Sequence, residues 1–185
     1  MLDRVADVCS FAQSLLSSKP PEAAVLLDMV LARSAKLPAD AVDEACRSAH
    51  VDTIALLLRR GFKATTKAMT YAAVKGDLSI IELLLAHGCP VDAEFGDSPF
   101  LCAVSGGHVD AARRLVAAGA NLPHRTDINV FVCAAKSDKG AEMIEFLLGL
   151  GFSAVSTKNN INTTPLITIA RHSSAVAVAA CERLL

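Results

Sequence analysis

The feature that most constrains this chain is a repeated spacing between an alanine and a glycine. The glycine follows 16 residues after the alanine in three pairs and 17 residues after it in a fourth: Ala45 and Gly61, Ala72 and Gly88, Ala103 and Gly119, Ala134 and Gly151. Successive glycines are 27, 31 and 32 residues apart, and we place the extra residue of the fourth pair at 137–140. Self-similarity with a period of about 20–50 residues predicts a solenoid, because a single such unit cannot bury its apolar face alone.

Each repeat has the pattern of two short helices joined by a tight turn. Around the third pair, Ser98 can cap free N–H groups, and Pro99 fits the first turn of a helix. A second helix covers 109–118, and Gly119 ends it because the residue after a helix commonly needs a positive φ. The same pattern predicts helix pairs at 39–48 and 52–60 and at 66–75 and 79–87.

These motifs resemble those of the ankyrin repeat family, whose unit is about 33 residues long and begins with T-P-L-H-x-A. Residues 98–103 (SPFLCA) and 164–169 (TPLITI) are similar to that start, and Gly107-His108 and Gly119-Ala120 are similar to the family's turn and end. The 27-residue repeats have almost no room for the family's β-hairpin, and its first-helix histidine is replaced by Asp43, Thr70, Leu101, Val132 and Ile167. The resemblance implies an all-α, ankyrin-like solenoid of stacked helix-turn-helix repeats.

We expect residues 1–185 to form one repeat solenoid. A degenerate capping unit at 1–36 would precede ankyrin-like repeats at 37–63, 64–90, 91–122, 123–154 and 155–185. The capping unit is predicted to hold helices at 2–17 and 22–33, the second with Val25, Leu26, Met29 and Val30 facing inward, and the last repeat to hold helices at 164–172 and 175–185. Caps of solenoids are commonly atypical. The four alanines of the repeated pairs are predicted to form a buried column.

Charge and hydropathy point away from several partner classes. The formal net charge is −1, which favours neither nucleic acid nor an anionic membrane surface, and no nucleic-acid-binding motif is present. No signal peptide is predicted, and no run of 18 apolar residues predicts a membrane span. We therefore expect an intracellular protein, cytoplasmic or nuclear, with no nucleic-acid and no membrane partner.

Six cysteines raise the question of disulfides or a metal site. None forms a CxxC motif, and all but Cys89 lie in predicted helices. Cys102 and Cys133 occupy the same repeat position, but stacked helices lie about 8–10 Å apart, beyond the Cα limit of about 7 Å for a disulfide. We interpret the cysteines as small core residues in a reducing compartment, and predict neither a metal nor a cofactor.

No catalytic constellation emerges from the sequence. A G-x-S-x-G motif, a glycine-rich phosphate loop and an HExxH motif are all absent. Ser105 and His108 are three residues apart, but they belong to a turn where other repeats place Asp77 or Lys139. We expect His50 and His108 to bond the backbone or a neighbouring repeat. Two alternatives stay open: a Cys/His-dependent enzyme or metal-binding regulator, and a structural segment of a larger protein.

The family resemblance implies noncatalytic recognition of a protein partner on a concave face lined by first helices and loops. The two residues after the alanine pair are the exposed ones on the first helix, and four of five repeats place a base there and none an acid. Such bases would favour an acidic segment of a partner, although ordinary solvated helix faces carry similar charges. With nearby lysines and aromatic anchors, the candidate site comprises Arg47, Lys63, Lys67, Tyr71, Lys75, Phe95, Lys136 and Arg171, and Phe62 is a further candidate anchor.

Overall fold

The computed structural model describes residues 14, 23–32, 37–48, 50–92, 98–123, 128–153 and 178, and within these ranges it contains helices and no strand. The chain divides into two compact units. The N-terminal unit comprises residues 1–72 and 77–93, and the C-terminal unit comprises residues 73–76 and 94–185. The described helices are α2 (Ala23–Leu31), α3 (Ala41–Ser48), α4 (Val51–Arg59), α5 (Thr66–Lys75), α6 (Leu78–Ala86), α7 (Pro99–Ser105), α8 (Val109–Ala117), α9 (Ile128–Ala135) and α10 (Gly140–Gly149).

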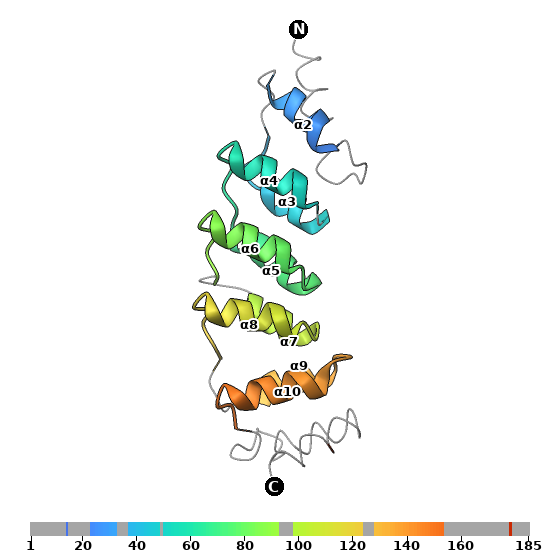
Figure 1. The fold of residues 1–185 in the computed structure, drawn as a ribbon, viewed down its shortest axis with the longest axis vertical. Coiled ribbons are helices and arrows are strands. Elements are labelled where there is room, and N and C mark those ends of the chain that lie inside the picture. Colours follow the sequence, from blue (N-terminus) through green and yellow to red (C-terminus); the bar gives the residue numbers. More distant parts are fainter. Residues whose placement is uncertain are drawn as a thin grey trace. The chain divides into compact units, whose positions relative to one another are not determined.

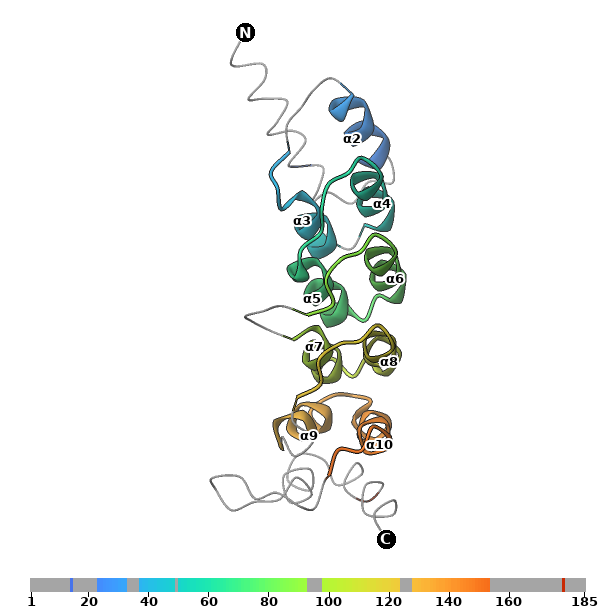
Figure 2. The same ribbon diagram turned by 90° about the vertical axis from the view of Figure 1, so that its left-hand side faces the viewer.

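Two layers of helices build the N-terminal unit, as Figures 1 and 2 show. The first helices of the repeats, α3 and α5, form one layer, and α2, α4 and α6 form the other. Helix α4 packs against α3, α2 and α6. Its residues Ile54 and Leu57 are fully buried, as are Ile80 and Leu84 of α6, so the core lies between the layers.

The C-terminal unit repeats this arrangement, with α7 and α9 in one layer and α8 and α10 in the other (Figure 2). Helix α7 packs against α8 and α9, and α10 packs against α9 and α8. Phe100 and Phe131 fill the core from equivalent places on α7 and α9, and both are fully buried. The ring of Phe131 meets that of Phe152 edge-on, with centroids 6.4 Å apart. The prediction of an all-α fold of helix pairs is confirmed.

The glycines of the four alanine–glycine pairs lie directly after the second helices or their last turns. Each follows a second helix in the left-handed region, with φ of 85° at Gly61, 72° at Gly88, 88° at Gly119 and 84° at Gly151. In all four repeats the next residue donates its N–H to the carbonyl five residues earlier, at 3.0–3.1 Å. This bond and the positive φ form the Schellman ending that satisfies otherwise open helix carbonyls. The predicted frame is therefore confirmed.

The alanines that define the repeats are buried, as predicted. Ala45, Ala72, Ala103 and Ala134 each have an exposed fraction of 0 %. In the C-terminal unit, Ala103 and Ala134 belong to α7 and α9, which pack against each other. Small side chains at these positions let the two helices approach closely.

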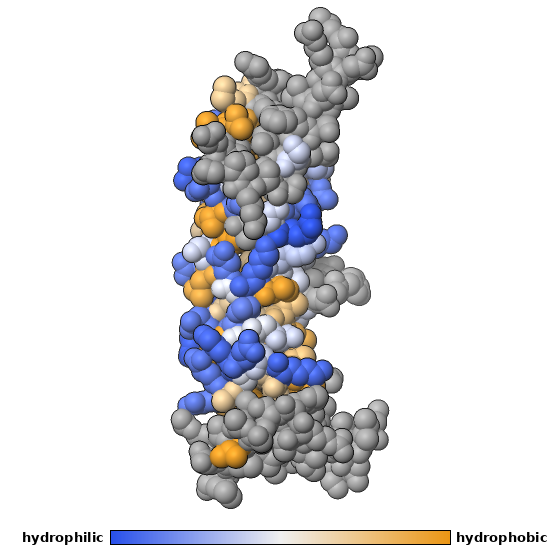
Figure 3. All heavy atoms as spheres, turned by 90° about the vertical axis from the view of Figure 1, so that its right-hand side faces the viewer, coloured by the Kyte–Doolittle hydropathy of each residue, from blue (hydrophilic) through white to orange (hydrophobic). Residues whose placement is uncertain are grey.

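The inward face predicted for the capping helix is wrong. In α2, Val25, Leu26 and Met29 are exposed by 62 %, 37 % and 56 %, whereas Leu27 is fully buried. Helix α2 packs against α4, and Asp28 pairs with Arg60 at 2.6 Å, so the Leu27–Asp28 side faces the unit. Small apolar patches lie among polar residues on the face shown in Figure 3. The side chain of Val30 and the helices predicted at 2–17, 164–172 and 175–185 lie outside the described residues, apart from the helical positions Ser14 and Val178.

Two local predictions also differ from the structure. Ser98 precedes α7, with Pro99 in the first turn, but the Ser98 hydroxyl makes no capping hydrogen bond. The extra residue of the fourth repeat is not in the turn. Lys139 precedes α10 five residues after Ala134, as His108 follows Ala103, and α10 has ten residues where α8 has nine. The extra residue therefore lies in the second helix.

Candidate functional site

The turns between paired helices contact one another in the C-terminal unit. The Nε2 atom of His108 lies 3.0 Å from the carbonyl oxygen of Val74, to which it can donate. The imidazole covers Gly76, which has a φ of 67° and where a Cβ would lie 2.3 Å from Nδ1. The predicted bond from His108 to a neighbouring repeat is therefore present. His50 holds the same position before α4, but its buried Nε2 has no hydrogen-bond partner within the described part of the chain.

Two residues of the candidate site, Lys75 and Lys136, belong to these turns. Lys75 is the last residue of α5, and Lys136 directly follows α9; both are exposed. Between their repeats, the end of α7 carries Ser105, and Gly106 follows it; both are exposed and uncharged. In the C-terminal unit, the ends of the first helices therefore carry a base in the repeats of Lys75 and Lys136 and uncharged residues in the repeat between them.

In the N-terminal unit, Arg47 is bound by an acid of its own helix. The Nε of Arg47 donates to both carboxylate oxygens of Glu44, at 3.1 and 3.0 Å. This hydrogen bonding lowers the pKa of Glu44 and raises the pKa of Arg47, and Tyr71 on α5 adds a smaller electrostatic contribution to Arg47. The pairing with Glu44 was missed, although its i,i+3 spacing is typical of helix ion pairs.

A buried acid fixes the start of α5, next to Lys67. Asp43 is 4 % exposed, and its two oxygens accept the backbone N–H of Thr65 at 3.0 Å and the Thr65 hydroxyl at 2.7 Å. The Thr65 hydroxyl oxygen in turn accepts the backbone N–H of Lys67 at 3.2 Å. At the position where the family has histidine, Asp43 thus joins one repeat to the start of the next through its hydrogen bonds to Thr65.

The same threonine is contacted from the other side by a thiol. The Sγ of Cys89 donates to the Thr65 carbonyl at 3.3 Å. Burial, and to a smaller extent the nearby negative charge of Asp43, raises the pKa of the Cys89 thiol to about 11. Thiolates are the nucleophilic form of cysteine, so Cys89 is inert near neutral pH.

A groove of about 430 Å³ brings an aromatic and a basic side chain together in the N-terminal unit. Phe62 and Lys63 line it from the connection after α4, and His87 and Cys89 line it from the end of α6. Lys63 is exposed and Phe62 half-buried, and the Nδ1 of His87 is bound to the Leu83 carbonyl at 2.9 Å. We call this the Phe62 groove. Sequence reasoning named Phe62 as an anchor candidate but missed the groove itself.

Phe95 and Arg171, the two remaining residues of the candidate site, lie outside the described residues. The structure describes Arg47, Lys63, Lys67 and Tyr71 in the N-terminal unit and Lys75 and Lys136 in the C-terminal unit. Every base among these is exposed, and Tyr71 is half-buried.

Within the described ranges, the structure shows neither a disulfide nor a group of side chains that could bind a metal ion. Cys46, Cys89, Cys102 and Cys133 carry thiols that are not joined in disulfides, and no group of three or more His, Cys, Asp or Glu side chains there could hold a metal ion. Within the same ranges, no helix has the length and apolar character that a membrane span requires.

Comparison with known sequences identifies what this arrangement is similar to. A family model described as ankyrin repeats (3 copies) matches residues 42–130. The ankyrin repeat and KH domain-containing protein mask-1 of Caenorhabditis elegans is 32 % identical over 103 residues, covering 54 % of this chain and 4 % of that protein. An ankyrin repeat, SAM and basic leucine zipper domain-containing protein 1 of Eulemur macaco macaco is 29 % identical over 107 residues, covering 56 % and 22 %. The chain thus matches less than a quarter of the length of either relative.

Solved structures share the fold. The ankyrin repeat domain of human ASB11 superposes with a TM-score of 0.71 at 21 % identity, over 95 % of this chain and 82 % of that one. An ankyrin repeat domain from Acinetobacter baumannii gives 0.64 at 20 % identity, over 95 % and 97 %. The ankyrin repeat domain of Bcl-3 gives 0.57 at 22 % identity, over 77 % and 67 %.

Proposed function

We propose that this chain, which matches the ankyrin repeat family model over residues 42–130, is a noncatalytic module that binds an acidic segment of a protein partner along its first helices and the connections before them. Ankyrin repeat domains are generally protein–protein interaction modules, and repeat stacks use extended concave surfaces for binding. Free thiols are stable in a reducing compartment, which supports an intracellular site of action, cytoplasmic or nuclear.

The observation that carries this proposal is the Phe62 groove. It places an aromatic anchor beside the exposed Lys63, while Lys67 lies on the first turn of α5 that Asp43 holds in place. An acidic side chain on a peptide can pair with the lysines while a neighbouring apolar residue enters the groove. The bases mainly raise the association rate, and the buried apolar contact slows dissociation.

Arg47 and Tyr71 extend the proposed surface within the N-terminal unit. Lys75 and Lys136 of the C-terminal unit, like Phe95 and Arg171, stay predictions from the sequence. Arg47 already binds Glu44, so an acidic ligand must compete with that carboxylate. Removing the negative charge with Glu44→Gln should therefore strengthen binding of an acidic ligand, whereas removing an exposed acid elsewhere should change this binding little.

A fluorescent peptide that alternates glutamate with leucine tests the proposal, with a glutamine–leucine peptide as the neutral control. Lys67→Glu should slow association several-fold at low salt and lose this effect at high salt. Arg59→Glu reverses an exposed base at the end of α4 and is the matched control, with an unchanged association rate. Equal binding of the two peptides, or equal effects of the two variants, would refute the proposal.

A further inference from the structure

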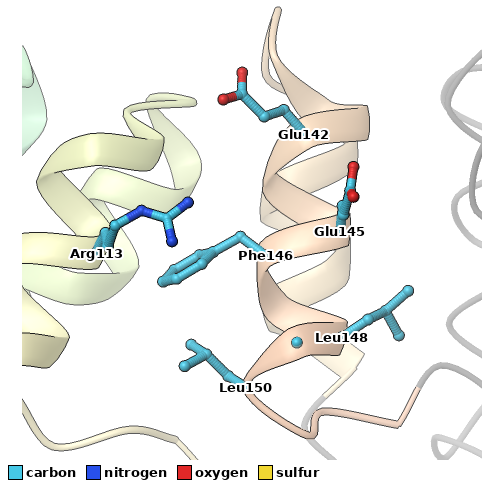
Figure 4. A pocket seen from close by; sticks show the side chains of 7 residues that line it. Arg113, Glu142, Glu145, Phe146, Leu148 and Leu150 are labelled. Atoms are coloured by element: carbon cyan, nitrogen blue, oxygen red, sulfur yellow. The ribbon is translucent and has the colours of Figure 1, made fainter.

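The second helices of the C-terminal unit enclose a groove that the proposed function does not use. It has a volume of about 750 Å³, within the range of ligand-binding clefts. We call it the second-helix groove; it is lined by Arg113 of α8 and by Glu142, Glu145, Phe146, Leu148, Gly149 and Leu150 of α10 or its end. Figure 4 shows Glu142, Phe146 and Leu150 along the side of α10 that faces Arg113, with Glu142 and Leu150 at opposite ends. The groove is therefore acidic at one end and aliphatic at the other.

The middle of the groove already holds a cation against an aromatic ring. The guanidinium carbon of Arg113 lies 5.1 Å from the centroid of Phe146, a distance typical of cation–π pairs. This contact positions the ring as one wall and leaves the ends of the groove to other groups. Helix α10 (GAEMIEFLLG) carries two acids and no base, and within the described residues no cation forms an ion pair with the exposed Glu142.

Gly149 keeps the groove open. It lies in the last turn of α10 and is exposed, and a Cβ added there would meet nothing within 4 Å. Its φ is not positive, so neither the backbone nor a close neighbour requires glycine. Glycine in a helix lowers stability relative to alanine. At this position the missing side chain leaves room beside Leu150 that any larger residue would reduce.

We propose that the second-helix groove is a docking site for a protein segment in which an arginine is flanked by leucine-like residues. Charge complementarity selects this occupant, because the Glu142 carboxylate can bind a guanidinium at one end with charge-assisted hydrogen bonds. The flanking apolar side chain packs on Leu150 and on the edge of Phe146. Arg113 repels the incoming base from the centre of the groove, which fixes the direction in which the segment lies. The second-helix groove thus attracts a basic segment, whereas the surface of the proposed function attracts an acidic one. The two proposals are therefore independent of each other.

A short capped peptide with arginine between two leucines is the probe, and the same peptide with citrulline in place of arginine is its uncharged control. Amide chemical shifts of the isotope-labelled full chain report the binding. The arginine peptide should shift amides of α8 and α10, and the citrulline peptide should bind about tenfold more weakly or worse, since hydrogen bonds to charged groups carry that difference. Glu142→Gln should cause the same loss. Asp110→Asn, an exposed acid of α8 that does not line the groove, should not.

Gly149 supplies the steric test. Gly149→Ala should bind nearly as the natural chain does, whereas Gly149→Gln should fill the groove and abolish binding; both should fold, which thermal melting checks. The proposal is overturned if the arginine peptide shifts no amide of α10, or if its shifts lie on the first helices. It is equally overturned if the citrulline peptide or a peptide with glutamate in the arginine position binds as tightly, or if Gly149→Gln leaves binding unchanged.

Discussion

Replacing Gly76 by alanine should destabilise the chain more than the same change at Gly119, although both glycines have a positive φ. At Gly119 the φ is 88° and an added Cβ has open space, so the cost is that of left-handed backbone, about 1–2 kcal/mol. At Gly76 the φ is 67°, and the Cβ would lie 2.3 Å from Nδ1 and 2.4 Å from Cγ of His108. A Cβ and a ring carbon cannot share that space.

The difference between the two variants measures the clash. If the imidazole stays, the overpacking costs about 1–3 kcal/mol. If it moves away, its hydrogen bond to Val74 is lost, which costs about 0.5–1.5 kcal/mol, along with its packing on the turn. Gly76→Ala should therefore cost about 2–5 kcal/mol in total, the sum of the backbone cost and the overpacking cost. In a chain of this size each kcal/mol lowers the Tm by about 2–4 °C.

Urea denaturation of the two single variants and of a double-mutant cycle with His108→Ala provides the assay. Removing the imidazole should reduce the cost of Gly76→Ala to that of Gly119→Ala, because only the backbone conformation remains unfavourable. The reasoning is wrong if the two glycine variants are equally stable, or if the cost of Gly76→Ala is the same with and without the histidine ring.

Four further outcomes follow from three buried residues, Ala103, Asp43 and Cys89. Ala103→Leu should overpack the α7–α9 contact and cost about 1–3 kcal/mol, and an unchanged melting curve would contradict this. Asp43→Ala removes both acceptors of Thr65 and should cost about 1–3 kcal/mol in urea titrations, whereas Glu44→Ala, which removes an exposed pair, should cost far less. Cys89 should stay unalkylated in mass spectra of the native chain at neutral pH. Because its pKa rises from 9.0 to about 11 on folding, its contribution to stability is fully present below pH 9 and should be lost as the pH rises to 11, a loss absent in Cys89→Ala.

The spacing of the repeats could be predicted from the sequence because two structural positions in each repeat strongly favour one residue type. A left-handed residue after a helix favours glycine, and close helix packing favours alanine, so both kinds of residue recur at fixed offsets. The helix predicted at 66–75 agrees with α5, and those predicted at 22–33, 39–48, 52–60, 79–87 and 109–118 agree with α2, α3, α4, α6 and α8 within two residues at either end. These features depend on residues close in the chain.

Contacts between distant residues could not be predicted in the same way. Asp43 and Thr65 are 22 residues apart, and nothing near Asp43 indicates its partner. The inward face of α2 could not be chosen because apolar residues occur on every side of AAVLLDMVL, so periodicity does not single out Leu27. The second-helix groove likewise depends on the separation of α8 and α10, which the sequence pattern does not contain.

The Schellman endings have a consequence for how the chain opens. In each of four repeats the residue after the closing glycine donates its N–H to a carbonyl of the second helix: Phe62 to Leu57, Cys89 to Leu84, Ala120 to Leu115, and Phe152 to Leu147. Such an amide exchanges its hydrogen with solvent only when that helix end opens. The four amides are therefore matched reporters, one in each repeat. Their exchange rates measure the local opening free energies repeat by repeat, and a substitution in one repeat should accelerate exchange there first and then in its neighbours within the same unit.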